Sequence, residues 1–195
     1  MNKADFKDEY ILQILGHIGI GILLYLFESL SKVYFSAAML YFIWWIITAP
    51  EAQKTRAVLI GCAYFAGAEV LFRMTKGGLA YEGSKYLVIL FMLMGMFFRG
   101  LSGKGYPYFI YLIALVPSII VASITLTYDA RFRTNIAFVL SGPVCLGIGA
   151  LFCYGRRVGY SLMYDVIKFI ALPSIAITTY LILYNPIIRD TISGT

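Results

Sequence analysis

The sequence predicts an all-α protein, a polytopic bundle of about seven (six or seven) transmembrane helices. Hydrophobic residues make up 61% of the 195 residues and charged residues only 13%, which is about half the charged share of soluble domains. The apolar residues form long continuous runs, and the charges lie mainly between these runs. A chain in lipid must satisfy its backbone polar groups internally, as a helix bundle or a closed barrel, and continuous rather than alternating runs favour helices.

Seven apolar segments are predicted to cross the membrane. They lie at residues 11–26, 33–49, 57–72, 86–98, 106–126, 135–154 and 162–184. A crossing needs about 20 residues. The last three segments have that length, and the first three reach it with flanking Tyr, Ser and Ala residues. The fourth segment has the shortest apolar stretch, which is why six spans remain an alternative to seven.

The whole chain, residues 1–195, is interpreted as one transmembrane domain, because no hydrophilic stretch is long enough for a soluble one. No small-residue cleavage site follows the first apolar run, so we expect a retained helix rather than a signal peptide. With a cytoplasmic N-terminus, nine Lys and Arg residues fall inside and seven outside, a weak positive-inside preference. The net charge of +6 is spread over many loops and does not indicate nucleic-acid binding.

Prolines and small residues are expected to shape the bundle. Pro117, Pro143 and Pro173 fall within apolar segments, where proline removes a backbone hydrogen bond and bends a helix. Bent helices could surround a cavity, although membrane helices also tolerate proline without a function. Small residues recur at helical spacing at Ser141, Cys145 and Gly149, and again at Ala63 with Gly67. Such stripes allow close helix approach.

Four ionisable residues lie within apolar runs and are the default functional candidates: His17, Glu69, Asp165 and Lys168. His17 is interpreted as a neutral histidine hydrogen-bonded to another helix, with a proton relay as the alternative. Glu69 and Arg73 are spaced i, i+4 in the favourable order for an ion pair. They are expected to form a structural clamp, or else to present Arg73 to a substrate. Asp165 and Lys168, spaced i, i+3, are expected to pair at the membrane boundary with Lys168 snorkelling.

Arg131 and Arg133 lie in the most polar outer connection, residues 127–134, directly before the sixth segment. Arginine suits phosphate oxygens, and a helix N-terminus attracts anions. Together with Arg73, they are candidates to bind the pyrophosphate of a lipid-linked substrate, the alternative being contact with ordinary lipid headgroups.

Familiar catalytic and metal-binding motifs are absent from the sequence. It contains no glycine-rich phosphate loop, zinc-type HExxH, nucleophile elbow or paired-cysteine site. The three cysteines, Cys62, Cys145 and Cys153, have no metal-ligand spacing, and their odd number argues against a disulfide framework. The sequence therefore predicts no metal site and no cofactor, and it identifies no catalytic residue.

Three stretches resemble bacterial O-antigen ligase and polymerase-like membrane proteins of the Bacteroidetes type. These are RTNIAFVLSGP at residues 133–143, EVLFRMTKGG at residues 69–78 and YNPIIRDTISGT at residues 184–195. The resemblance implies the N-terminal half of a GT-C-like fold in the inner membrane. It also implies transfer of a glycan from a polyprenyl-pyrophosphate carrier at the outer face, without nucleotide sugar or metal, for O-antigen or exopolysaccharide.

The same resemblance implies about twice as many helices and a large outer loop carrying the main functional residues. This chain has no such loop, so we expect either a missing C-terminal half or a partner subunit, and whether the chain alone is an enzyme is open. Two other functions remain as alternatives. One is a small transporter with His17, Glu69 and Asp165 along a water-filled path, and the other is a non-catalytic membrane subunit or scaffold.

Overall fold

The computed structural model describes the backbone of residues 3–125 and 130–184, and the side chains of residues 10–121, 124 and 138–184. Every regular element in these ranges is helical. The helices are α1 (Lys3–Leu26), α2 (Leu30–Thr48), α3 (Glu51–Met74), α4 (Gly83–Arg99), η1 (Gly103–Gly105), α5 (Tyr106–Ala114), α6 (Val116–Thr125), α7 (Ala130–Cys153) and α8 (Tyr160–Tyr184). The predicted fold class is therefore confirmed at the level of an all-helical protein.

Each predicted segment coincides with a helix, or with a pair of helices in the case of the fifth. Four stretches are long and apolar enough to cross a membrane: Leu30–Thr48, Glu51–Met74, Gly103–Val121 and Tyr160–Tyr184. Shorter apolar helical stretches occur at Tyr10–Leu26 and Phe138–Cys153. This pattern is that of a helical membrane protein.

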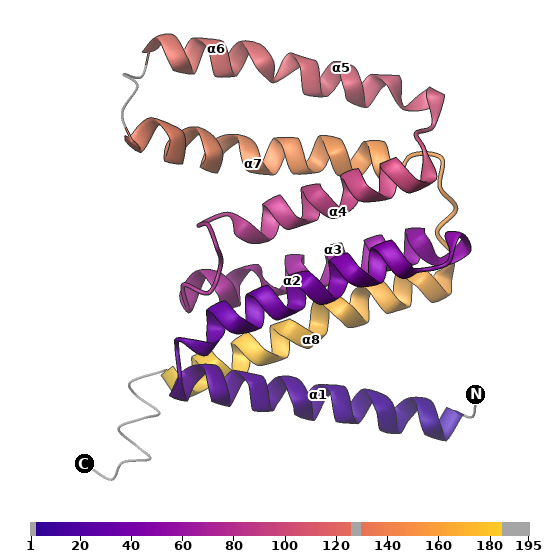
Figure 1. Cartoon of the computed structure of the whole chain (residues 1–195), viewed down its shortest axis with the longest axis vertical. Helices are drawn as coiled ribbons and strands as arrows, with labels where there is room; N and C mark the ends of the chain where they lie inside the picture. The colour runs from indigo at the N-terminus through magenta and orange to yellow at the C-terminus, as the bar shows by residue number, and fades with distance from the viewer. Residues whose placement is uncertain (1–2, 126–129, 185–195) are drawn as a thin grey trace.

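The helices form a broad array rather than a ring around a central channel (Figure 1). Neighbours in the array follow the order α1, α8, α3, α4, α7 and then α5 with α6, while α2 packs on α3 and also contacts α4 and α1. Helix α3 is central, and 61% of its most apolar stretch is buried, against 6% in the Gly103–Val121 stretch at the edge. Helix α3 therefore organises the packing.

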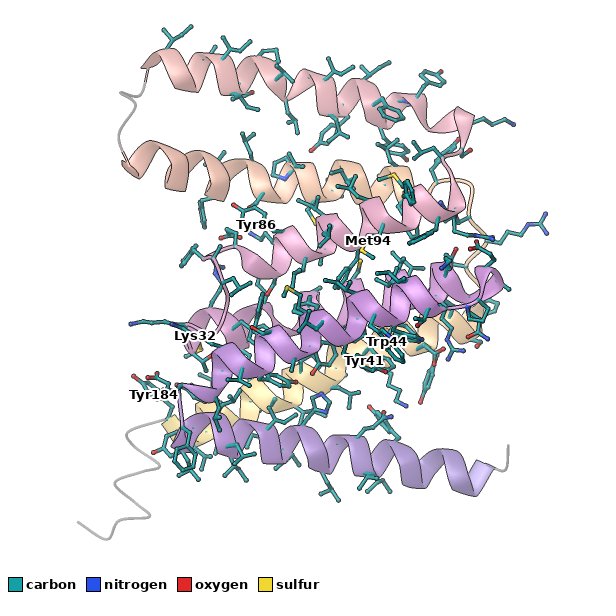
Figure 2. All side chains as sticks on the ribbon, viewed as in Figure 1. Lys32, Tyr41, Trp44, Tyr86, Met94 and Tyr184 are labelled. Atoms are coloured by element: carbon teal, nitrogen blue, oxygen red, sulfur yellow. The ribbon has the colours of Figure 1, made fainter. Side chains whose placement is uncertain are left out.

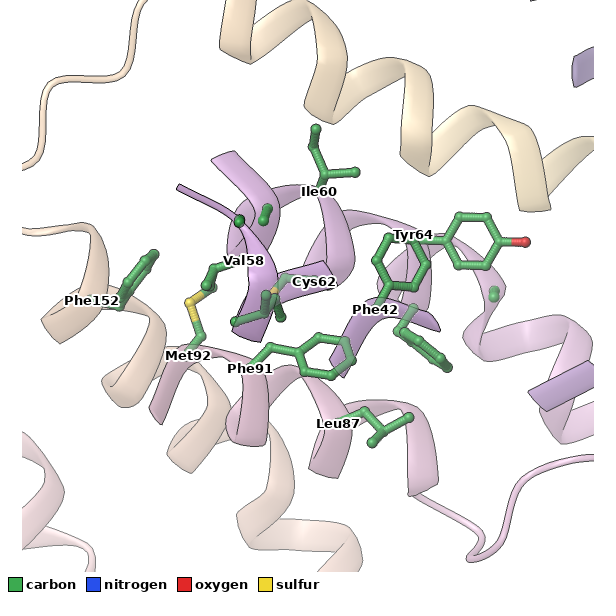
Figure 3. Packing of buried hydrophobic residues seen from close by; sticks show 14 of the residues in the cluster. Phe42, Val58, Ile60, Cys62, Tyr64, Leu87, Phe91, Met92 and Phe152 are labelled. Atoms are coloured by element: carbon green, nitrogen blue, oxygen red, sulfur yellow. The ribbon is translucent and has the colours of Figure 1, made fainter. Parts of the chain in front are cut away.

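Aromatic side chains fill the core around α3 (Figure 3). Phe65 of α3 lies 5.7 Å from Phe91 of α4 and 5.6 Å from Phe35 of α2, measured between ring centroids. Both contacts are edge-on, the arrangement that ring quadrupoles favour. Phe152 brings α7 to the same cluster. One continuous core thus joins four helices.

Glycines allow α8 to lie close to its neighbours. A Cβ atom at Gly21 of α1 would lie 2.6 Å from the Ala176 carbonyl oxygen, and one at Gly67 of α3 would collide with the Ile170 carbonyl oxygen. The close approach predicted at Gly67 is confirmed. The seam predicted on α7 is wrong at Gly149, because a Cβ there would meet nothing within 4 Å.

Proline interrupts one helix and not two others. The fifth predicted segment breaks between Ala114 and Val116, and Pro117 is the second residue of α6. Proline lacks the N–H that would continue the helix and clashes with the carbonyl four residues earlier. The α-helices α7 and α8, by contrast, run without a break through Pro143 and Pro173.

Substitution of Gly67 by alanine should lower the free energy of unfolding by about 1–3 kcal/mol, because the added methyl group meets a backbone carbonyl that cannot move aside. Gly149→Ala is the matched control on α7 and should not lower the free energy of unfolding, and should raise it by up to about 1 kcal/mol, because alanine favours a helix over glycine. Unfolding of both variants in mixed detergent micelles measures the difference. Equal stability of the two variants would contradict the packing described for α3 and α8.

Candidate functional site

Four charged residues meet where α3 ends and α4 begins, a place called here the α3–α4 end of the bundle. Glu69 pairs with Arg73 at 3.5 Å and with Lys85 at 3.6 Å. Glu82 pairs with Arg73 at 2.9 Å and with Lys85 at 2.6 Å. The two carboxylates and two cations therefore form a closed, electrically balanced ring, called here the charge cluster.

Glu82 is the most buried member of the charge cluster, with a side chain only 3% exposed. Its Oε1 accepts a hydrogen bond from Arg73, and Ser141 of α7 donates to its Oε2 at 3.5 Å. A buried carboxylate is costly unless it is paired and hydrogen-bonded. Glu82 meets both conditions, and in doing so it links three helices.

Aromatic rings cover the cations of the charge cluster. The Arg73 guanidinium lies 4.5 Å from the centre of the Tyr81 ring, and the Lys85 ammonium lies 5.9 Å from that of Phe138. Cations over aromatic faces gain further electrostatic stabilisation, most when water is excluded. The rings also restrict where Arg73 and Lys85 can point.

A cavity of about 440 Å³ lies between α3, α4 and α7, with the charge cluster at one edge. Glu69 and Lys85 line it together with apolar residues such as Phe65 and Met92. Helix α7 contributes the small residues Gly142, Cys145, Gly149 and Ala150. The space is partly open, and its walls are almost entirely apolar, with Glu69 and Lys85 of the charge cluster at one edge.

The prediction of an ion pair between Glu69 and Arg73 is confirmed. Sequence reasoning missed Glu82 and Lys85. The fourth predicted segment begins at residue 86, so both residues fell in the connection before it. Their i, i+3 spacing beside a helix start was the available signal, since acid and base at that spacing lie on one helix face.

His17 is hydrogen-bonded to another helix, as predicted. Its Nδ1 donates to the Gln13 carbonyl oxygen at 2.8 Å, so its Nε2 is the acceptor for the Tyr64 hydroxyl at 3.2 Å in the neutral ring. Tyr64 is bonded in turn to Tyr34 of α2. This polar chain joins α1, α3 and α2.

Asp165 pairs with Arg56 of α3 at 2.8 Å. The prediction had paired it with Lys168, its neighbour on α8, whereas the observed partner belongs to a different helix. The Lys168 ammonium lies 4.9 Å from the centre of the Tyr10 ring on α1. Of the three residues proposed for a transporter path, only Glu69 lines the cavity, and all three have partners.

Arg131 and Arg133 fall within α7, which begins at Ala130, rather than in the loop before it as predicted. Their side chains lie outside the described residues.

Cations at the opposite end of the bundle stabilise helix ends. Lys54 donates to the carbonyl oxygens of Ile46 and Ile47 at the end of α2, at 3.3 and 2.9 Å. Arg156, just beyond α7, donates to the Phe152 and Gly100 oxygens at 2.5 and 2.8 Å. Burial, together with the charge of Arg99, lowers the pKa of Arg156, although a guanidinium stays protonated in proteins. These contacts explain the cations without a ligand.

Within the described residues, no group of three His, Cys, Asp or Glu side chains is placed to hold a metal ion. No protein-family model, curated protein or solved structure matches the chain.

Replacing Glu82 by glutamine should destabilise the protein by about 3 kcal/mol, because Arg73 and Lys85 lose their most buried counter-charge. Glu51→Gln is the matched control. Glu51 pairs with Lys54 at 3.9 Å and Arg99 at 4.0 Å but is 64% exposed, so its loss should cost less than about 1 kcal/mol. Thermal unfolding in detergent compares the two, and similar losses would contradict a structural role for the charge cluster.

Proposed function

We propose that this chain handles a lipid-linked glycan, holding the lipid in the cavity between α3, α4 and α7 and the polar headgroup at the charge cluster. The observation that carries the proposal is an apolar cavity with the charge cluster at its edge. A lipid has the same two parts, an apolar chain and a polar head, which match the cavity and the charge cluster. A partly open apolar space between helices suits a lipid chain.

The charge cluster suits a phosphorylated sugar better than a simple anion. Arg73 and Lys85 carry more N–H donors than their carboxylate partners use, since guanidinium has five and ammonium three. Those donors fit phosphate oxygens, while the partly exposed carboxylate of Glu69 can accept hydrogen bonds from sugar hydroxyls. A neutral cluster can thus bind both parts of a glycosyl phosphate.

In its specific form, the proposal is a protein of the O-antigen ligase or polymerase type that uses a polyprenyl-pyrophosphate-linked glycan. The transfer would take place at the outer face of a bacterial inner membrane, with the N-terminus in the cytoplasm and seven spans of a GT-C-like fold. The resemblance of residues 69–78 and 133–143 supports it. Residues 69–78 include Glu69 and Arg73 of the charge cluster, and Arg131 and Arg133 are further candidates for phosphate. Fixed cations aimed at a developing phosphate charge would stabilise the leaving group.

A second candidate function is a non-catalytic membrane subunit. The Gly103–Val121 stretch favours it, because only 6% of its most apolar part is buried and its large side chains, such as Ile110 and Ile113, face outward. Another membrane protein could cover that surface. This function makes no use of the cavity, so a test of lipid binding separates the two candidates.

The native cysteine Cys145 provides that test, because it lines the cavity. In a Cys62→Ala, Cys153→Ala background in phosphatidylcholine nanodiscs, polyprenyl phosphate should slow the reaction of Cys145 with N-ethylmaleimide several-fold, since a bound chain covers the thiol. An equal amount of phosphatidylglycerol should have little effect. Quantitative mass spectrometry measures the labelling.

The control variant is Val33→Cys in a background in which Cys62, Cys145 and Cys153 are all replaced by alanine. Val33 is an exposed residue of α2 and does not line the cavity. Its labelling should be the same with and without polyprenyl phosphate. Unchanged labelling of Cys145 would overturn the proposed function and favour the subunit alternative. Equal protection of both cysteines would show only a change in the bilayer, and would overturn the proposed site as well.

A further inference from the structure

A second hollow, separate from the cavity, lies at the loop between α3 and α4. It measures about 270 Å³ and is lined by Arg73, Lys76 and Tyr81 together with the backbone around Gly78. The two hollows share no lining residue. Arg73 belongs to the charge cluster, so the cluster stands between the cavity and this second hollow, called here the loop pocket.

Lys76 of the loop pocket adopts a backbone conformation that lysine rarely uses. Its φ angle is +51°, and it is the one non-glycine residue with a positive φ among those described. Lys76 follows Thr75, the C-cap residue of α3. At this helix end, the Lys76 N–H bonds to the Arg73 carbonyl at 3.4 Å and the Gly77 N–H to the Phe72 carbonyl at 2.9 Å. This helix ending normally has glycine in the place of Lys76.

The lysine at this position therefore costs stability that glycine would not. Gly77 and Gly78 follow directly, so glycine is plentiful here but does not occupy the left-handed position. Backbone strain of this kind is concentrated at functional sites, such as active sites and ligand-binding sites. Among the described residues, Lys76 takes part in no ion pair, whereas nearby Arg73 and Lys85 each take part in two.

We propose that the loop pocket is a binding site for a phosphate group, with Lys76 and Arg73 as its ligands. The Lys76 ammonium has three donors, and the planar Arg73 fork retains donors beyond those used by Glu69 and Glu82. A tetrahedral phosphate offers oxygens to both cations at once. The pocket adjoins the end of α3, which is long and apolar enough to cross a membrane. The ends of such helices lie near the headgroups, where lipid phosphates and soluble phosphates both have access.

This site goes beyond the proposed function, because it involves a different hollow and does not need the cavity to hold a lipid. It assigns Lys76 a role that neither the cavity nor the charge cluster uses. Because Arg73 is shared, phosphate in the loop pocket would also act on the charge cluster through its pairs with Glu69 and Glu82.

Lys76→Gly tests the site, since it removes the charge and relieves the strain together. The full chain is purified in an uncharged maltoside detergent and titrated with inorganic pyrophosphate, using the rise in Tm as the readout. In a parallel arm, phosphatidic acid is added to phosphatidylcholine nanodiscs. Saturable stabilisation in the first arm indicates a soluble phosphate, and stabilisation in the second arm alone indicates a lipid headgroup.

Without ligand, Lys76→Gly should be at least as stable as the wild type, so loss of folding cannot explain a loss of binding. The ligand concentration that gives half of the full rise in Tm should be roughly tenfold higher for this variant, the expected effect of losing one charged hydrogen bond. Lys76→Arg should keep the response. Lys32→Ala is the matched control for net charge. Lys32 is exposed, and its side chain projects outward at the same end of the bundle as the loop pocket (Figure 2).

The proposal is overturned by stabilisation in neither arm, by an unchanged response of Lys76→Gly, or by an equal weakening in Lys32→Ala. The last result would mean that general charge rather than the pocket attracts phosphate. Lys76 does not line the cavity, so a failure of this site leaves the expected protection of Cys145 standing even though Arg73 is shared.

Discussion

The cost of charge in an apolar environment is the constraint on which this structure depends. Glu69 belongs to the central helix, and Glu82 is almost completely buried beside it. Neither carboxylate is tolerable there alone. Arg73 and Lys85 remove that cost by pairing with both, and the resulting charge cluster fixes the end of α3 against the start of α4. Ser141 extends the arrangement to α7.

The cavity follows from the same arrangement of three helices. Bulky aromatic residues fill the space between α2, α3 and α4, whereas α7 offers small side chains toward α3 and α4. Glycines on α1 and α3 allow α8 to approach closely, whereas Gly142 and Gly149 of α7 face open space. Polar groups at the edge of an apolar hollow are the usual composition of a ligand site. The charge cluster is thus both a structural joint and the polar part of the candidate site.

Much of the fold could be predicted because long apolar runs have few options in lipid. The seven segments coincide with helices for that reason, and Pro117 marks a real break. Pairing between distant residues could not be predicted from spacing. Asp165 has a basic neighbour three residues away, yet its partner is Arg56, since α8 packs on α3. Likewise, a stripe of small residues has the same sequence signature whether a neighbouring helix fills the space beside it or not.

The charge cluster was only half predicted, for a related reason. Glu69 and Arg73 lie on one helix, and their spacing alone brings them together. Glu82 belongs to the connection between two helices, where charged residues are ordinarily solvated. Its burial depends on how α4 and α7 close over that connection, which is a property of the assembled bundle and not of any single segment.

A double-mutant cycle between Arg73 and Glu82 tests most directly whether the charge cluster holds this end of the bundle together. The stabilities of Arg73→Gln, Glu82→Gln and the double variant are compared with that of the wild type in detergent. The account predicts a coupling free energy of about 2 kcal/mol, with the double variant clearly more stable than the sum of the single losses implies. Additive losses, with coupling below about 0.5 kcal/mol, would contradict it.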